Sequence, residues 1–260
     1  MFRLRLKPEQ KRWWEFLWAM TERELKARYK VTKLGFYWMF LNPIFQMLVI
    51  VMVFQFVFSN KVDNYPVFVF IGIIVWNYFS GSVLKNVSIV TNERSLFQKS
   101  NFPRETMVFS TIVVNAVNLL ISFLLVFVYL LLFGFVKYWI LFLFPLALIN
   151  LFFITSGLSL LLSALNVRHR DVEFIFGAIL PLWFYATPVI YSLSMLPRTI
   201  AWVFYLNPLT GVVDGFRYSI LGLVPYSVWA CILSLIVNFF VFIFTLFYFK
   251  KKSCYFNDFI

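Results

Sequence analysis

Long apolar runs without a charged side chain dominate the chain. Six of them contain no Asp, Glu, Lys, Arg or His. Four of the six are longer than the about 20 residues that a helix needs to cross a bilayer, and the other two are slightly shorter. They are Phe36–Phe58, Pro66–Leu84, Met107–Phe133, Trp139–Leu165, Phe174–Tyr191 and Val228–Phe249. Strands of a membrane barrel would be about 10 residues long and alternate in polarity, which these runs do not. The pattern predicts an all-α membrane protein with six transmembrane helices.

Composition supports this interpretation. Of the 260 residues, 62% are hydrophobic and 13% are charged, whereas soluble domains are about half apolar and about a quarter charged. So few charges exclude a soluble enzyme, and so much apolar surface excludes a disordered chain. We expect a cytoplasmic N-terminal segment over 1–35, a six-span transmembrane domain over 36–249 and a cytoplasmic basic tail over 250–260.

The positive charges predict the orientation. If the N-terminus is cytoplasmic, 19 of the 23 Lys and Arg residues fall on the inner side and 4 on the outer side. The positive-inside rule then places both termini in the cytoplasm. The net charge of +12 is mostly this topology signal, so we expect no nucleic-acid partner. The N-terminus has no long apolar run before residue 36 and does not resemble a cleavable signal peptide.

Several chemistries are disfavoured. Ion-coupled carriers need ionisable groups within the membrane, and the six spans have none. No Gly is followed by Lys, so the chain has no P-loop and cannot be its own ATPase. The two cysteines, Cys231 and Cys254, are unsuited to a disulfide and have no metal-ligand spacing. We expect neither a metal nor a cofactor in this chain.

Residues 13–33 predict an amphipathic helix, or two short ones, at the membrane surface. Glu22 and Lys26, like Glu24 and Arg28, are spaced i, i+4 in the favourable order. Thr21 and Glu24 have the spacing of a capping box. Two interpretations stay open: an anchor for the first span, or a docking helix for a cytoplasmic partner. The charged loops around residues 91–105 and 166–173 are likewise either solvated connectors or partner contacts.

The segment 187–227 is too interrupted for two more spans and too apolar for a free loop. Pro residues divide it, and we expect two short re-entrant or interfacial helices, Pro197–Leu206 and Pro208–Leu221. Asp214 and Arg217 are spaced i, i+3 and are predicted to pair. The segment is either an outer gate or a cap without a role in transport. The candidate gate and channel residues are Tyr185, Pro188, Tyr191, Trp202, Tyr205, Asn207, Pro208, Asp214 and Arg217.

These pieces, in this order, resemble a known family. Residues 22–46, ERELKARYKVTKLGFYWMFLNPIFQ, look like the start of a type 2 ABC transporter permease of the polysaccharide export family. Phe102–Pro103, Arg170–Asp171, TPVIYSLSMLP (187–197) and NPLTGVVDGFRYSILG (207–222) are similar to its later motifs. The resemblance covers nearly the whole chain.

The resemblance implies a function and partners. Members of that family export lipid-linked O-antigen, capsule or teichoic-acid chains across the bacterial inner membrane as homodimers. A separate cytoplasmic ATPase carries the ATP and Mg. By resemblance, the ATPase contacts are Glu22, Arg23, Lys26, Arg28, Tyr29, Glu93, Arg94, Lys99, Arg170 and Asp171. The aromatic rings near the outer face are a candidate surface along which a sugar chain slides.

Other functions remain as alternatives. A type 2 ABC permease for a drug, a lipid or teichoic acid would have the same layout. A membrane-embedded lipid-modifying enzyme would need acid, base or metal-ligating side chains, for which His169, Asp171 and Glu173 form the best cluster. That cluster is small and contains the only histidine, so it fits an enzyme poorly. A passive channel is disfavoured by the charge-free spans.

Overall fold

A computed structural model of the chain has helices and no strands in the part of the chain that it describes. The described residues are 8–29, 37–58, 62, 64–94, 96, 102–133, 141–225, 227–253, 255 and 256. Three short helical pieces connect or cap the longer ones: α4 (Ile89–Asn92), η2 (Leu141–Leu143) and η3 (Leu193–Met195). The other helices are α1 (Pro8–Tyr29), α2 (Trp38–Phe58), α3 (Tyr65–Val87), α6 (Glu105–Leu132), α7 (Phe144–Arg168), α8 (Asp171–Ala186), α9 (Arg198–Phe204), α10 (Pro208–Leu221) and α11 (Val228–Ser253).

Five helices of the described residues are long and apolar enough to cross a membrane. They correspond to α2, α3, α6, α7 together with η2, and α11, and each contains most of one predicted span. The sixth predicted span, Phe174–Tyr191, coincides only in part with α8, which has 16 residues. The described residues therefore form an all-helical structure with five helices that could span a membrane.

α8 ends earlier than its apolar run because a proline follows. Thr187, the residue before Pro188, has extended backbone angles, φ −103° and ψ 135°. The ring of a proline disfavours helical angles in the preceding residue. Hydropathy alone extends the predicted helix to Tyr191, while the backbone turns away from the helix five residues earlier.

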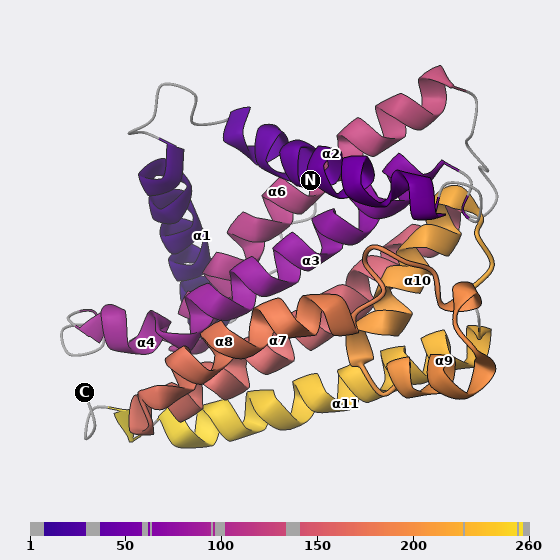
Figure 1. The fold of residues 1–260 in the computed structure, drawn as a ribbon. Helices are drawn as coiled ribbons and strands as arrows, with labels where there is room; N and C mark the ends of the chain where they lie inside the picture. The colour runs from indigo at the N-terminus through magenta and orange to yellow at the C-terminus, as the bar shows by residue number, and fades with distance from the viewer. Residues whose placement is uncertain are drawn as a thin grey trace.

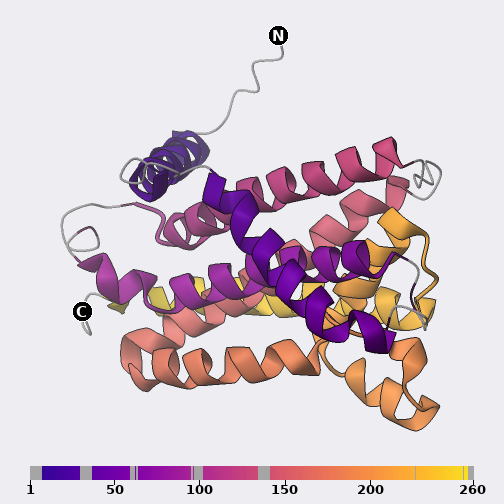
Figure 2. The same cartoon turned by 45° about the horizontal axis from the view of Figure 1, so that its top comes forward.

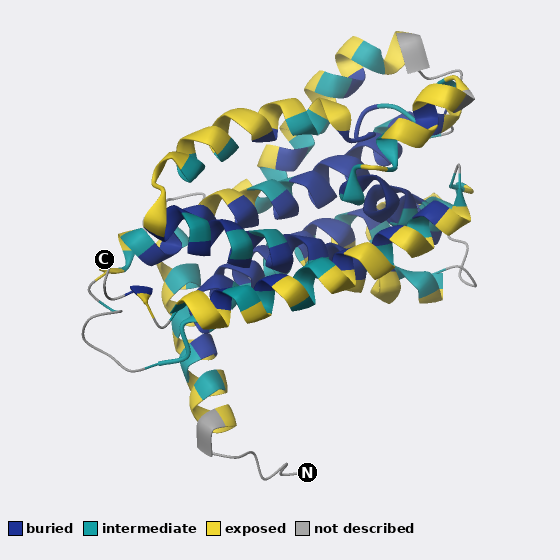
Figure 3. Ribbon diagram, turned by 90° about the horizontal axis from the view of Figure 1, so that it is seen from below, coloured by how far each residue is buried: buried dark blue, intermediate teal, exposed yellow. Residues whose placement is uncertain are grey.

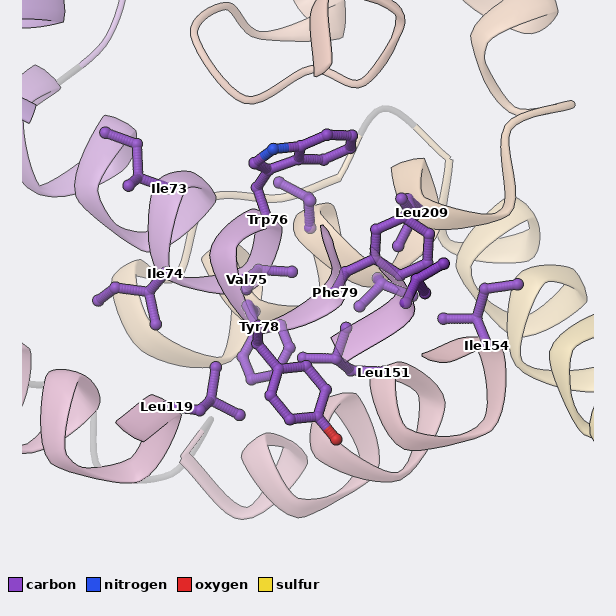
Figure 4. Packing of buried hydrophobic residues seen from close by; sticks show 14 of the residues in the cluster. Ile73, Ile74, Val75, Trp76, Tyr78, Phe79, Leu119, Leu151, Ile154 and Leu209 are labelled. Carbon is purple, nitrogen blue, oxygen red and sulfur yellow. The ribbon is translucent and has the colours of Figure 1, made fainter. Parts of the chain in front are cut away.

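The core is built around α3, which is mostly buried. α2, α6, α7, α8 and α10 all pack against it, and α7 packs in turn against α11. Figure 4 shows Phe79 of α3 among Leu151 and Ile154 of α7 and Leu209 of α10. Aromatic rings extend this core, since Trp76 and Phe79 of α3 meet Phe184 and Trp183 of α8 at 5.4 Å between centroids.

The two ends of the bundle differ. α1, α4 and the C-terminal end of α11 lie at one end, while α9 and α10 lie at the opposite end (Figure 1). α1 stands beside the bundle and packs mainly on α6, and α2 crosses α3 obliquely (Figure 2). We call these the α1 end and the α10 end.

The outward faces are apolar, as a lipid environment requires. Exposed residues follow the outer sides of the helices, whereas buried residues lie along the centre (Figure 3). On α2, for example, Phe56 and Met52 are 90% and 75% exposed. Large exposed apolar surfaces on a soluble monomer would be exceptional, so this pattern agrees with the membrane assignment.

α1 is one continuous helix of 22 residues, so the alternative of two short helices is wrong. Thr21 does not cap a second helix. Its Oγ1 donates instead to the Leu17 carbonyl at 2.8 Å, one turn back in the same helix. A threonine in a helix interior can satisfy its hydroxyl in this way, and capping-box spacing by itself does not distinguish the two cases.

Candidate functional site

The α10 end contains the two short helices that the prolines predicted. α9 covers Arg198–Phe204 and α10 covers Pro208–Leu221, and the predicted bounds of α10 agree with both ends. Pro208 occupies the first turn of α10, where its missing N–H costs nothing. Gly222 ends α10 with φ 68°, in the left-handed region that glycine adopts without strain.

Asn207 joins three parts of this end. Its side chain caps α10 by accepting from the Leu209 N–H at 3.1 Å. Its Nδ2 donates to the Ala186 carbonyl at 3.1 Å and to Thr187 Oγ1 at 2.8 Å. Its Oδ1 also accepts from Trp183 Nε1 at 3.0 Å. One amide therefore fixes the start of α10 against the end of α8.

Arg217 holds the turn that follows α8. The side chain is 3% exposed, and its Nη1 donates to the Pro188 carbonyl at 2.6 Å. Nη2 donates to the Val189 carbonyl at 2.7 Å, with a longer contact to the Phe68 carbonyl at 3.4 Å. The guanidinium also lies 3.4 Å from the Phe68 ring centroid, a cation–π contact. A single side chain of α10 thus binds α3 and residues 188–189.

Gly72 makes this approach possible. A Cβ at this position of α3 would lie 2.9 Å from the Val189 carbonyl oxygen and 3.0 Å from Arg217 Nη2. Real Cβ atoms do not approach a backbone oxygen so closely. The absence of a side chain at Gly72 therefore lets the turn after α8 pack directly on α3.

Asp214 has a different partner from the predicted one. Tyr205 donates from its hydroxyl to Asp214 Oδ2 at 2.9 Å, and the Ser227 N–H donates to the Tyr205 hydroxyl at 3.2 Å. No ion pair joins Asp214 to Arg217 among the described residues, so the predicted direct pair is wrong. Both charges are buried, but each finds hydrogen-bond partners on another segment.

A polar cluster inside the bundle anchors α10 and was not predicted. Ser234 of α11 donates to the Pro208 carbonyl at 2.8 Å. Asn238, one turn further along α11, donates to Asn150 Oδ1 of α7 at 2.7 Å. Gly211 allows this packing, since a Cβ there would lie 2.6 Å from Ser234 Cβ. Isolated Asn and Ser residues within the apolar runs at 139–165 and 228–249 were the available signal.

The predicted aromatic residues have two kinds of surroundings. Tyr185 and Trp202 are 66% and 54% exposed, so their rings are available to lipid or to another molecule. Tyr191 donates to the Tyr185 carbonyl at 2.9 Å and packs edge-on against Phe204. Tyr191 therefore stabilises the turn as well as lying near the surface.

At the α1 end, some charged side chains of α1 are exposed, and others bond to neighbouring parts of the bundle. Lys26 donates to Glu22 at 2.5 Å, which confirms the i, i+4 pair, and this bond holds the pKa of Glu22 below its usual value. Both side chains are exposed. Arg23 instead pairs with Glu93, which follows α4. The predicted contact residues Arg23 and Glu93 therefore bind each other.

Glu24 and Arg28 extend this inward network. Glu24 pairs with Lys85 of α3 and accepts from Thr111 of α6 at 3.2 Å. Arg28 donates to Asn115 of α6 at 2.9 Å and reaches Glu24 at 3.5 Å. The sequence predicted the Glu24–Arg28 pair but not the other partners, which lie 61 to 87 residues away. α1 is therefore bonded to both α3 and α6.

The remaining candidate contacts are partly visible. Arg94, Arg170 and Asp171 are exposed. Arg170 precedes α8 without a capping hydrogen bond from its side chain, and Asp171 is in the first turn of α8. α8 begins at the α1 end of the bundle (Figure 1). Lys99 and the Tyr29 side chain lie outside the described residues. The described residues contain no group of three or more His, Cys, Asp or Glu side chains that could hold a metal ion.

Comparison with known proteins decides the family. Residues 15–221, which include α2 to α10, match the ABC-2 type transporter family. This chain belongs to the ABC-2 type transporter family. A permease named O-antigen export system permease protein RfbA, from Myxococcus xanthus, is 36% identical over 201 residues, covering 76% of this chain and 77% of that protein. A Klebsiella pneumoniae protein of the same name is 28% identical over 205 residues, covering 78% and 79%.

Membership of the ABC-2 family confirms the resemblance predicted from the sequence motifs. The ABC-2 match begins within α1 and ends with the last residue of α10. Most of α1, and all of α9 and α10, therefore belong to the region that the family shares.

Proposed function

We propose that this chain is the membrane subunit of an ATP-driven exporter that moves a lipid-linked, O-antigen-like polysaccharide across the bacterial inner membrane. Two copies would form the pathway, and each would bind one separate ATPase chain that holds the ATP and Mg. The observation that carries this proposal is the match to permeases named for O-antigen export over three-quarters of the chain. The apolar helices and the uneven distribution of Lys and Arg support an inner-membrane location with both termini in the cytoplasm.

We further propose that α8 is the sixth membrane segment. α1 and the C-terminal end of α11 lie at the same end of the bundle, so the chain must cross an even number of times. Five long spans and one passage through α8 meet this requirement. α9 and α10 are then re-entrant helices at the outer face. Hydrogen bonds join α10 and its cap to α3, to the end of α8 and to α11, and α10 also packs on α7, which supports a role in closing the pathway.

The ATPase would dock at the α1 end. Glu22 and Lys26 on α1, with Arg94, Arg170 and Asp171, are exposed charges there and are the proposed contacts. Arg23, Glu24 and Arg28 are bonded inward and would transmit movement of α1 to the bundle. The outer aromatic residues Tyr185 and Trp202 would offer flat apolar faces to the sugar chain.

A deletion strain tests the proposed substrate. Cells lacking this chain should lose the polysaccharide from their surface and accumulate its lipid-linked form inside. The gene for the wild-type chain should restore export, and the labelled glycan should then become accessible to an external glycosidase. Normal surface polysaccharide in the deletion strain would overturn the substrate assignment and point to another cargo for this ABC-2 permease.

A further inference from the structure

A polar cavity opens between α1, α2, α3 and α6. It encloses about 250 Å³. Residues that bear on its chemistry are Arg28, Trp38, Asn42, Asn77, Asn115 and Asn118. They come from the end of α1, the start of α2, the later half of α3 and the first half of α6. The cavity therefore lies toward the α1 end, in the half of the bundle that the proposed orientation places in the cytoplasmic leaflet.

Carboxamides dominate the polar part of its wall. Four asparagines from three helices line the cavity. Two of them join a chain of amides, because Asn77 donates to Gln46 at 2.9 Å and Gln46 donates to Asn42 at 3.3 Å. Such groups are expensive in a bilayer and usually functional. Interhelical hydrogen bonding alone would explain amide pairs, but it would not require four of them around a hollow.

The other lining groups suit a sugar phosphate. A carboxamide both donates and accepts hydrogen bonds, as a sugar hydroxyl does. Trp38, which is 50% exposed, offers an indole face for stacking on a sugar ring. Arg28 contributes a guanidinium that also pairs with Glu24 at 3.5 Å, and the described residues that line the cavity include no carboxylate. Asn115 orients the guanidinium by accepting from it at 2.9 Å.

Gly81 faces the open part of the cavity. It lines the hollow in the middle of an apolar helix, and a Cβ there would meet nothing within 4 Å. Glycine costs about 1 kcal/mol relative to alanine inside a helix. Close packing explains Gly72 and Gly211, but it does not explain Gly81. A side chain at this position would project into the open space beside the amides.

We propose that this cavity binds the first sugar and phosphate of a lipid-linked glycan in the cytoplasmic leaflet, before the chain enters the pathway. This inference rests on the proposed function. The volume is slightly below the about 300–1,000 Å³ of pockets for drug-sized ligands, so it suits one sugar phosphate rather than a polymer. The lipid tail would remain in the bilayer beside the exposed face of α2.

Filling the cavity tests the proposal. Gly81→Leu adds a side chain to the open space, and Gly177→Leu on α8 is the matched control, because its Cβ would also meet nothing within 4 Å and it does not line the cavity. The permease, purified with its ATPase and placed in nanodiscs, would be titrated with a radiolabelled lipid-diphosphate disaccharide. Gly81→Leu should weaken binding about tenfold or more, which corresponds to about 1.4 kcal/mol, while Gly177→Leu should bind like the wild type.

Removing an amide tests the sugar contact separately. Asn77→Leu should weaken binding of the lipid-diphosphate disaccharide more than binding of the same lipid diphosphate without sugar. Gln55→Leu, which removes an exposed amide of α2 outside the cavity, should change neither. Equal losses for both probes in Asn77→Leu would overturn the sugar contact.

A protection assay adds a readout that does not need transport. Gly81→Cys, with Cys231 and Cys254 replaced by Ser, should react with a maleimide, and the lipid-diphosphate disaccharide should slow this reaction. If Gly81→Leu binds the lipid-diphosphate disaccharide as well as the wild type does, and the disaccharide does not protect Gly81→Cys from the maleimide, the cavity is not the binding site. The proposed function would remain intact. Absence of any glycan binding or export by the wild-type complex would overturn the proposed function and the site together.

Discussion

A guanidinium surrounded by backbone carbonyls organises the α10 end. Arg217 donates to the carbonyls of Pro188 and Val189. These residues follow the end of α8, so their carbonyls have no partner within that helix. In water these carbonyls would bind solvent, but in a buried turn they need a donor from the protein. The planar fork of an arginine reaches two acceptors at once, which lysine cannot do in the same geometry.

Arg217→Met should destabilise the protein. The substitution leaves two buried carbonyls without their donor, at a cost of about 1–3 kcal/mol each, so we expect a loss of about 2–6 kcal/mol. Thermal unfolding of the purified protein in detergent measures this. Arg168→Met, at an exposed position near the end of α7, is the control and should leave the unfolding temperature almost unchanged. An equal unfolding temperature in both variants would contradict the role of Arg217.

Gly72→Ala should also destabilise, by overpacking. Its Cβ would lie 2.9 Å from a backbone oxygen that Arg217 holds in place, and relief requires α3 and the turn to separate. Overpacking in a dense core costs about 1–3 kcal/mol. Gly177→Ala meets no neighbour and should be neutral or stabilising by up to about 1 kcal/mol. The same unfolding assay compares them, and a neutral Gly72→Ala would show that the turn is not tightly packed on α3.

At the residue scale, the sequence indicated which positions matter better than it indicated their partners. A buried Asp and Arg three residues apart suggested a pair, because a charge inside an apolar segment needs compensation. The actual partners are a tyrosine hydroxyl and two carbonyls on other segments. Carbonyl acceptors have no signature in the sequence, since every residue has one and only the fold decides which are free.

At the element scale, α1 is bonded to the bundle as well as packed against it. Its contacts with α6 are extensive, and the phenyl rings of Phe16 and Phe102 stack at 4.2 Å between centroids. Ion pairs add directional contacts to α3 and to Glu93. A helix held in this way moves together with α3 and α6, so a force applied to its outer face reaches the core.

Reversing one member of the Arg23–Glu93 pair should impair coupling. Arg23→Glu and Glu93→Arg each place like charges together and should lower ATP-driven export several-fold, while an exposed pair contributes only about 1 kcal/mol or less to stability. The double variant Arg23→Glu with Glu93→Arg restores opposite charges and should recover most of the export. Glycan export by cells, normalised to the amount of protein in the membrane, is the measurement. No recovery in the double variant would mean that each residue acts through a different partner.

Element boundaries were predictable where local chemistry fixes them. Asn207, Pro208 and Gly222 carry cap, first-turn and end signals, and α10 begins and ends accordingly. α8 was predicted too long, since hydropathy counts apolar residues and gave too little weight to Pro188. The sequence did not predict the polar cluster of Asn150, Ser234 and Asn238, nor the polar cavity. In both cases the residues come from separate helices. Their assembly depends on how the helices pack, which periodicity does not specify.

At the scale of the whole molecule, the two ends should face opposite sides of the membrane. Leu206→Cys lies after α9 at a position that is 83% exposed and should react with an impermeant maleimide in cells whose outer membrane has been permeabilised. Trp18→Cys on α1, at a 61% exposed position, should react only after the inner membrane is opened. Both variants would carry Ser at positions 231 and 254. The reverse labelling pattern would invert the proposed topology.

The shortness of α8 has a consequence for the surrounding lipid. Its 16 residues span about 24 Å at 1.5 Å per residue, against about 30 Å of hydrocarbon in a typical bilayer. The missing length at the α10 end is taken up by a turn and by α9, which carries the exposed Trp202, an amphipathic residue type that settles at the headgroup level. With α8 as the proposed sixth membrane segment, acyl chains beside it would compress or tilt, at a cost of fractions of a kcal/mol per ångström. The proposed topology thus implies a thinned patch of membrane beside α8, where a polar chain would have less hydrocarbon to cross.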